Sequence, residues 1–180
     1  MKKIIFILIL IFSNLSATKT QLFNLYKNGE YQKSCELGFS NFSKYANDEE
    51  FITIYALGCV EADFIDRLAV PITSLKYTKE ARANSSYFAT ILFQKKLLYQ
   101  ALKDGYDISH ISLPTTEYVL SVVFDLYKEL EDKNASEFLL EDKKDSSIKY
   151  RLYMKKDARI DKMVIEKIKD DKVIQKHIYW

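Results

Sequence analysis

Two histidines are the first candidates for catalytic chemistry, because histidine is the usual general acid or base near neutral pH. His110 lies close in sequence to Asp107 and Ser109, the residue types of a hydrolase site, and His177 lies near the C-terminus. No HExxH, GxSxG or glycine-rich phosphate motif surrounds either histidine. We therefore interpret both as surface or structural residues, and the sequence predicts no catalytic residue, no metal site and no cofactor.

Carboxylates gather at residues 48–50 and 129–132. The first group suits the positive N-terminus of a helix, and the second has the pattern of a helix end. No pair of general acid and general base can be selected from them. The sequence thus favours a protein that is not an enzyme.

The N-terminus has the pattern of an export signal. Lys2 and Lys3 precede an unbroken apolar run from Ile4 to Phe12, and a small residue, Ala17, follows at a position that suits signal peptidase. The run is shorter than the roughly 20 apolar residues that span a membrane. We predict a signal peptide at residues 1–17, a mature chain without a transmembrane segment and, from the lysine-rich, arginine-poor bacterial composition, localisation in the periplasm.

The two cysteines are predicted to pair, because an even number of cysteines in an exported protein usually indicates a disulfide. Apolar residues recur at helical spacing on both sides of Asn47, which indicates a helical hairpin. Cys35 and Cys59 each lie twelve residues from Asn47, so antiparallel helices rising about 1.5 Å per residue bring them to the same height. Two buried free thiols are the alternative.

Helical patterns extend to about residue 134, and a period of two follows. We expect helices near residues 18–28, 30–46, 48–63, 71–82, 84–105 and 114–133, with Gly29 and Gly105 at helix ends. Alternation then predicts strands near 148–155, 163–168 and 173–180. The fold class is mainly α (α+β), with about six antiparallel-paired helices at 18–134 and a small antiparallel sheet at 135–180 that packs on them.

The charge of the chain changes near the same point. Residues 18–142 hold 13 basic and 19 acidic side chains, whereas residues 143–180 hold 12 basic and 6 acidic. We therefore expect a basic face on the sheet, formed by Lys149, Arg151, Lys155, Lys156, Arg159 and Lys162. Such a face suits an acidic partner or an anionic envelope polymer, and nucleic acid is not an expected ligand of an exported protein. A solvated face is the alternative.

The run Leu25-Tyr26-Lys27-Asn28-Gly29-Glu30-Tyr31-Gln32-Lys33-Ser34-Cys35 resembles the helix-turn-helix corner of a tetratricopeptide repeat, with Ser34 at the small position. Lys33 to Gly38 and Leu57-Gly58-Cys59 are similar to parts of the cysteine-bearing Sel1-like variant. The resemblance covers residues 22–82 and implies a TPR-like scaffold with a protein-binding groove and no chemistry of its own. Repeat proteins of this kind in Gram-negative bacteria serve envelope machines, such as cell-wall enzymes, the Tol system and the periplasmic scaffold of flagellar motors.

Asn134 is the candidate modification site. The run Asp132-Lys133-Asn134-Ala135-Ser136 resembles the extended acidic sequon of bacterial N-glycosylation, and it falls in the polar break between the last helix and the sheet. An ordinary asparagine at a helix end is the alternative.

Together these features predict a non-enzymatic periplasmic adaptor that binds another cell-envelope protein. The alternative is a binding protein for peptidoglycan or lipopolysaccharide that uses the basic sheet.

Overall fold

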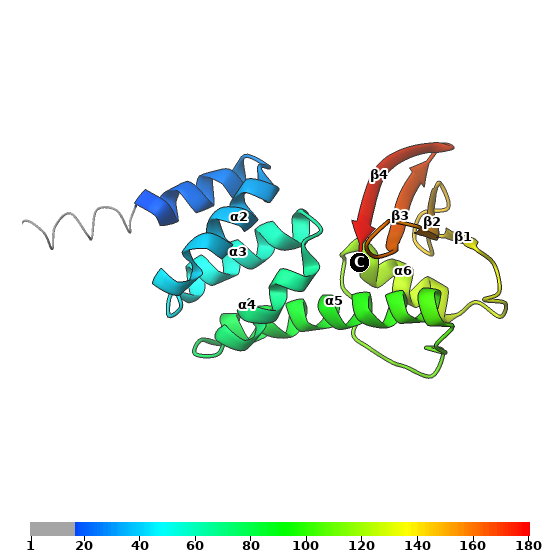
Figure 1. The fold of residues 1–180 in the computed structure, drawn as a ribbon, viewed down its shortest axis with the longest axis horizontal. Coiled ribbons are helices and arrows are strands. Elements are labelled where there is room, and N and C mark those ends of the chain that lie inside the picture. Colours follow the sequence, from blue (N-terminus) through cyan, green and yellow to red (C-terminus); the bar gives the residue numbers. More distant parts are fainter. Residues whose placement is uncertain (1–16) are drawn as a thin grey trace, which may run out of the picture. The chain divides into compact units, whose positions relative to one another are not determined.

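The computed structural model describes residues 17–180, so the predicted signal peptide, apart from Ala17, lies outside the described residues. The protein is mainly helical and ends in a small antiparallel sheet, as the sequence predicts (Figure 1). Two compact units meet inside helix α5 (Lys79–Asp104): unit 1 ends at Ser85, and unit 2 is Ser86–Trp180. Among residues 17–180, no helix combines the length and the apolar character that crossing a bilayer requires.

Unit 1 consists of short helices joined by tight turns. They are a helix at residues 17–27, α2 (Tyr31–Asn41), the 3₁₀ turn η1 (Phe42–Lys44), α3 (Glu49–Glu61), the 3₁₀ turn η2 (Ile65–Leu68) and α4 (Ala69–Ser74). Gly29 has a φ of +76° at the end of the first helix, so the predicted glycine cap is confirmed. Asp48 begins α3 by accepting the backbone N–H of Phe51 at 3.0 Å.

The start of α5 differs from the prediction. The expected helix at residues 71–82 is interrupted, because α4 ends at Ser74 and α5 begins at Lys79. The cap is Thr78, whose hydroxyl accepts the backbone N–H of Ala81 at 3.1 Å. Asn84, near which the sequence predicts the start of the helix at 84–105, lies inside α5 instead.

Glu49 fixes the turn that separates α4 from α5. Its carboxylate accepts the backbone N–H groups of Lys76, Tyr77 and Thr78 at 2.7, 2.7 and 3.0 Å, and the Thr78 hydroxyl at 2.9 Å. Desolvation raises the pKa of this carboxyl, but the four donors outweigh it and lower the pKa from 4.5 to about 2. Because Glu49 lies far from the turn in sequence, the local pattern at 71–86 does not reveal this anchor.

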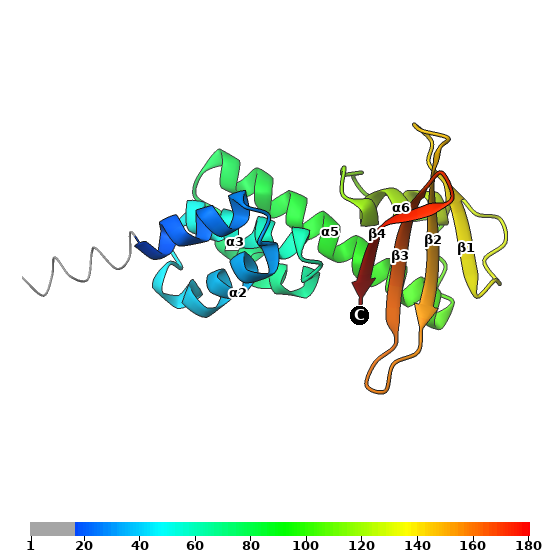
Figure 2. The same ribbon diagram turned by 90° about the horizontal axis from the view of Figure 1, so that it is seen from above.

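Unit 2 contains α5 from Ser86 onward, helix α6 (Val119–Lys128) and a meander of four strands. The strands are β1 (Glu137–Glu141), β2 (Ile148–Lys155), β3 (Lys162–Lys169) and β4 (Lys172–Tyr179), in the order β1-β2-β3-β4 (Figure 2). The sequence predicts the last three strands and misses β1, which has five residues and a glutamate at each end. Asp170 and Asp171 have φ angles of 50° and 57°, so two aspartates form the β3–β4 turn without glycine.

The inner face of the sheet covers α6 and the second half of α5. Phe138 of β1 packs edge-on against Tyr127 of α6, with 5.1 Å between ring centroids. Tyr99 of α5 donates to the carbonyl of Asp161 at 2.9 Å. The buried inner-face residues are Phe138, Leu140, Tyr150, Leu152, Met163, Ile165 and Tyr179. The sheet therefore packs on helices of its own unit, which a small sheet needs for stability.

Candidate interaction surfaces

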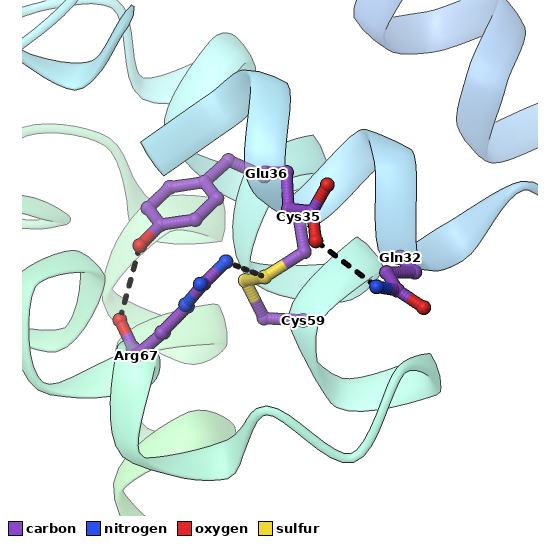
Figure 3. Close-up of a disulfide and its surroundings, with 6 residues drawn as sticks. Gln32, Cys35, Glu36, Cys59 and Arg67 are labelled. Carbon is purple, nitrogen blue, oxygen red and sulfur yellow. Dashed lines mark hydrogen bonds between the residues drawn. A yellow bond between two sulfur atoms is a disulfide. The ribbon is translucent and has the colours of Figure 1, made fainter. Parts of the chain in front are cut away.

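The disulfide lies between α2 and α3 in unit 1, as the count from Asn47 predicts. The sulfur atoms of Cys35 and Cys59 are 1.99 Å apart, and both residues are fully buried (Figure 3). Two glycines permit this close approach of the helices. A Cβ atom at Gly58 would lie 2.8 Å from the Ser34 hydroxyl oxygen, and one at Gly38 would lie 2.5 Å from Tyr55.

Arg67 of η2 covers the disulfide. Its guanidinium donates to Cys35 Sγ at 3.6 Å and lies over the rings of Phe39 and Phe64, 4.9 and 4.7 Å from their centroids. The Tyr55 hydroxyl donates to the Arg67 carbonyl at 3.3 Å. The cation thus contacts two aromatic rings and a sulfur atom of the disulfide, which is a structural role.

The outer face of the sheet, opposite the helices, is organised in rows that cross all four strands. The register places Leu139, Arg151, Glu166 and Lys176 in one row. A row of Glu137, Tyr153, Val164 and Ile178 lies on one side of it, and a row of Glu141, Lys149, Ile168 and Val173 lies on the other. Charged and apolar side chains therefore alternate on this face instead of forming a purely basic surface.

Glu166 is the centre of a charge network on the outer face. Its side chain is only 9% exposed, and its carboxylate pairs with Lys176 at 2.8 Å and Arg151 at 3.2 Å. The Tyr153 hydroxyl donates to the same carboxylate at 3.2 Å. Lys176 is the main cause of a lowered pKa of the Glu166 carboxyl, although desolvation acts in the opposite direction. Arg151 also pairs with Glu137 at 3.3 Å, so the network extends from β1 to β4.

The six residues predicted to form a basic face are divided by the structure. Lys149 and Arg151 lie on the outer face with acidic partners, since Lys149 is 3.8 Å from Glu141. Lys155 and Lys162 face each other across β2 and β3, and Lys156 and Arg159 lie in the loop that joins these strands. Within the described residues, none of these last four cations forms an ion pair within 4 Å. These four cations share the β2–β3 end of the sheet with Asp157 and with Asp161, which pairs with Lys103 at 2.6 Å.

The β4 strand exposes apolar side chains that the sequence analysis did not select. Val173, Ile174 and Ile178 are 50%, 51% and 45% exposed. The apolar residues Val173, Ile174 and Ile178 were the available signal, but in the sequence they predict only a strand. Which face is left uncovered depends on where the helices pack, and this is not a local property.

Unit 2 also has an open cavity of about 650 Å³ beside α6. Its walls come from residues 112–117, α6, the β1–β2 turn and Tyr150. The polar groups of the walls bind one another: Lys143 pairs with Glu129 at 2.6 Å, and the Tyr150 hydroxyl donates to Asp142 at 3.0 Å. These groups stabilise the walls and do not converge on a common point in the cavity.

The histidines do not form a catalytic arrangement with their neighbours in sequence. Ser109 donates its hydroxyl to Asp107 at 3.0 Å, and the ring of His110 packs edge-on against Tyr106. His177 of β4 is stacked in parallel with Tyr179, with 6.3 Å between centroids. Within residues 17–180, no three histidine, cysteine, aspartate or glutamate side chains converge as a metal ion would require.

Asn134 is exposed in the connection between α6 and β1. This connection is longer than predicted, because α6 ends at Lys128 and not near Lys133. The Asn134 side-chain amide donates to Asp132 at 2.9 Å, and so does its backbone N–H. The acidic residue of the sequon therefore contacts the acceptor amide directly.

A comparison with models of known protein families, with curated proteins and with solved structures finds no match to this chain.

Proposed function

We propose that this protein is a non-enzymatic adaptor of the bacterial periplasm that binds another cell-envelope protein. The observation that carries the proposal is the set of half-exposed apolar side chains on β4, because large exposed apolar groups gathered on one strand are typical of protein-binding surfaces. The fully buried disulfide supports an oxidising compartment such as the periplasm.

The helical unit supports the same proposal. Its short helices are joined by turns at Gly29 and Asp48, and we propose that they serve as a TPR-like or Sel1-like scaffold. Exposed aromatic residues, Phe23 and Phe39, are available on it as partner anchors. On this proposal the protein is an assembly part of an envelope machine, for which the periplasmic scaffold of a flagellar motor is one example.

A second candidate is a binding protein for an anionic envelope polymer, peptidoglycan or lipopolysaccharide. It is favoured by Lys155 and Lys162, two like charges that face each other across neighbouring strands without an acidic partner in the described chain. Like charges in this position are unfavourable unless an anion compensates them. The outer-face network around Glu166 argues for the adaptor, since it neutralises the cations at the centre of the sheet.

Mild crosslinking in intact cells of the native host, followed by affinity purification of the tagged chain, tests the proposal. The adaptor function predicts one envelope protein recovered in a constant ratio to the chain. Retention of the purified chain on isolated cell wall, lost when salt screens the charges, would favour polymer binding instead.

A further inference from the structure

The loop between β2 and β3 exposes an apolar side chain among charged ones. Every residue from Lys155 to Ile160 is exposed, and Ile160 itself is 41% exposed. The loop lies at one end of the sheet, whereas the β1–β2 and β3–β4 turns lie at the other end (Figure 2). Ile160 is therefore presented to the surroundings at an end of unit 2.

The two acids of this loop hold it in place. Asp161 pairs with Lys103 of α5 at 2.6 Å and accepts the backbone N–H of Asp157 at 3.3 Å. The Tyr99 hydroxyl donates to the carbonyl of Asp161 at 2.9 Å. The Asp157 carboxylate accepts the backbone N–H of Arg159 at 3.1 Å. Both carboxylates thus bind the backbone of the loop, and Asp161 also anchors the loop to α5.

The cations of the loop have no such bonds. They are Lys155, Lys156, Arg159 and Lys162. Within residues 17–180, none of the four has a carboxylate oxygen within 4 Å, and the register places Lys155 directly opposite Lys162. When Lys103 and the exposed Asp104 at the end of α5 are included, this end of the unit has five cations and three acids. The surroundings of Ile160 are therefore positively charged.

A cationic loop with an exposed apolar side chain suits a lipid surface better than a carbohydrate polymer. Anionic head groups attract lysine and arginine, whose long stems lie along apolar surface while the charged ends reach the phosphates. Ile160 gains free energy only where an apolar phase covers it, and acyl chains supply such a phase. A carbohydrate chain satisfies the cations alone.

We propose that the β2–β3 loop binds the surface of an anionic phospholipid bilayer, with Ile160 inserted at the boundary between head groups and acyl chains. The four loop cations lie beside the lipid phosphates. This contact goes beyond the proposed adaptor function, since it adds a membrane surface to the protein partner and uses neither β4 nor unit 1. Binding through one short loop is weak and reversible, and it raises the concentration of the chain beside a membrane.

Sedimentation with lipid vesicles tests the site on the full mature chain. The probe is a vesicle of equal parts phosphatidylglycerol and phosphatidylcholine. The chain should bind vesicles of phosphatidylcholine alone at least about tenfold more weakly, because neutral head groups do not attract the cations. Added salt should weaken binding to the anionic vesicles, because it screens the same attraction.

Two variants remove the apolar and the cationic part of the site separately. Ile160→Ser should weaken binding to the anionic vesicles at least about threefold, because the inserted apolar area is lost. Lys156→Gln combined with Arg159→Gln should weaken it at least about tenfold, because each cation near an anionic surface contributes about fivefold. All three positions are exposed, so thermal unfolding should match that of the wild type.

Matched controls lie at the opposite end of the sheet. Lys144→Gln combined with Lys172→Gln removes the same charge from the β1–β2 and β3–β4 turns, and Val173→Ser removes a half-exposed apolar side chain there. The eight-residue strands place these positions about 26 Å from the loop, beyond the Debye length of physiological salt. Each control should therefore change vesicle binding by less than about twofold.

Four results would overturn the proposal. They are no sedimentation with the anionic vesicles at millimolar lipid, equal binding to phosphatidylcholine, an equal effect of the double variant and its control, and binding that Ile160→Ser leaves unchanged. The last result would assign the loop to charge alone, as in binding of an anionic polymer. These assays contain no protein partner, so their failure leaves the adaptor function standing, and failure to recover a partner from cells leaves the lipid site standing.

Discussion

Gly38 of α2 lies directly against Tyr55 of α3, and a Cβ atom at position 38 would lie 2.5 Å from the Tyr55 Cβ. The contact leaves no room for a side chain at position 38, and it lies near the disulfide that joins the same helices. The helical hairpin of unit 1 therefore depends on the absence of a side chain at Gly38. An added methyl group has to push the helices apart or displace the Tyr55 ring.

The first prediction follows from this contact. Gly38→Ala should lower the free energy of unfolding by about 1–3 kcal/mol, because overpacking outweighs the better helix propensity of alanine. Ser40→Ala, an exposed position on the same helix, should change stability by less than about 0.5 kcal/mol. Urea denaturation followed by circular dichroism measures both changes. A Gly38→Ala protein as stable as the wild type would show that the helices separate without cost.

The second prediction concerns the disulfide. Cys35→Ser combined with Cys59→Ser should lower stability by about 2–5 kcal/mol, the usual effect of removing a native bridge from a small secreted domain. Wild-type protein melted in the presence of reductant should behave like this variant, and thiol titration of denatured, unreduced protein from the periplasm should find no free cysteine. Two titratable thiols in that protein would contradict the predicted pairing in cells.

The third prediction is a pH dependence at Glu49. Its pKa is about 2 in the folded protein and 4.5 ordinarily, so its contribution to stability is complete above about pH 4.5 and is lost as the pH falls through 2. Glu49→Gln should therefore melt at a lower temperature than the wild type at pH 7. Below pH 2 the two proteins should melt at the same temperature.

Glu131→Gln is the control for this effect, because Glu131 is exposed in the connection after α6. Its melting temperature should follow that of the wild type at every pH. A constant difference between Glu49→Gln and wild type from pH 7 to pH 2 would rule out the carboxylate as the cause.

Much of this architecture follows from local sequence, and the exceptions share a physical cause. Gly29, Cys35 and Cys59 were placed correctly because a helix end and the height of a residue in a hairpin depend only on nearby residues. The turn before α5 was misplaced because its anchor, Glu49, is on another helix. The basic face was only partly predictable, since the acids that neutralise Arg151 come from β1 and β3 and the pattern had not revealed β1.

The fourth prediction concerns Asn134, whose exposed amide contacts Asp132. In a native host that glycosylates proteins, the intact mass should exceed that of residues 18–180 with one disulfide by the mass of a glycan. Asn134→Gln should remove the excess mass, and Asn84→Gln should not, because Asn84 lies inside α5. A mass equal to the unmodified mature chain would reject the modification.

The most direct test of the adaptor function is a reciprocal purification. Chain and partner are first crosslinked in intact cells and identified, and the partner is then tagged in its turn and used to recover the chain. The adaptor function predicts that both purifications yield the same two proteins in the same fixed ratio, and that the complex withstands moderate salt because its core is apolar. Recovery of the chain only with cell wall or lipopolysaccharide, with no protein in fixed ratio, would contradict it.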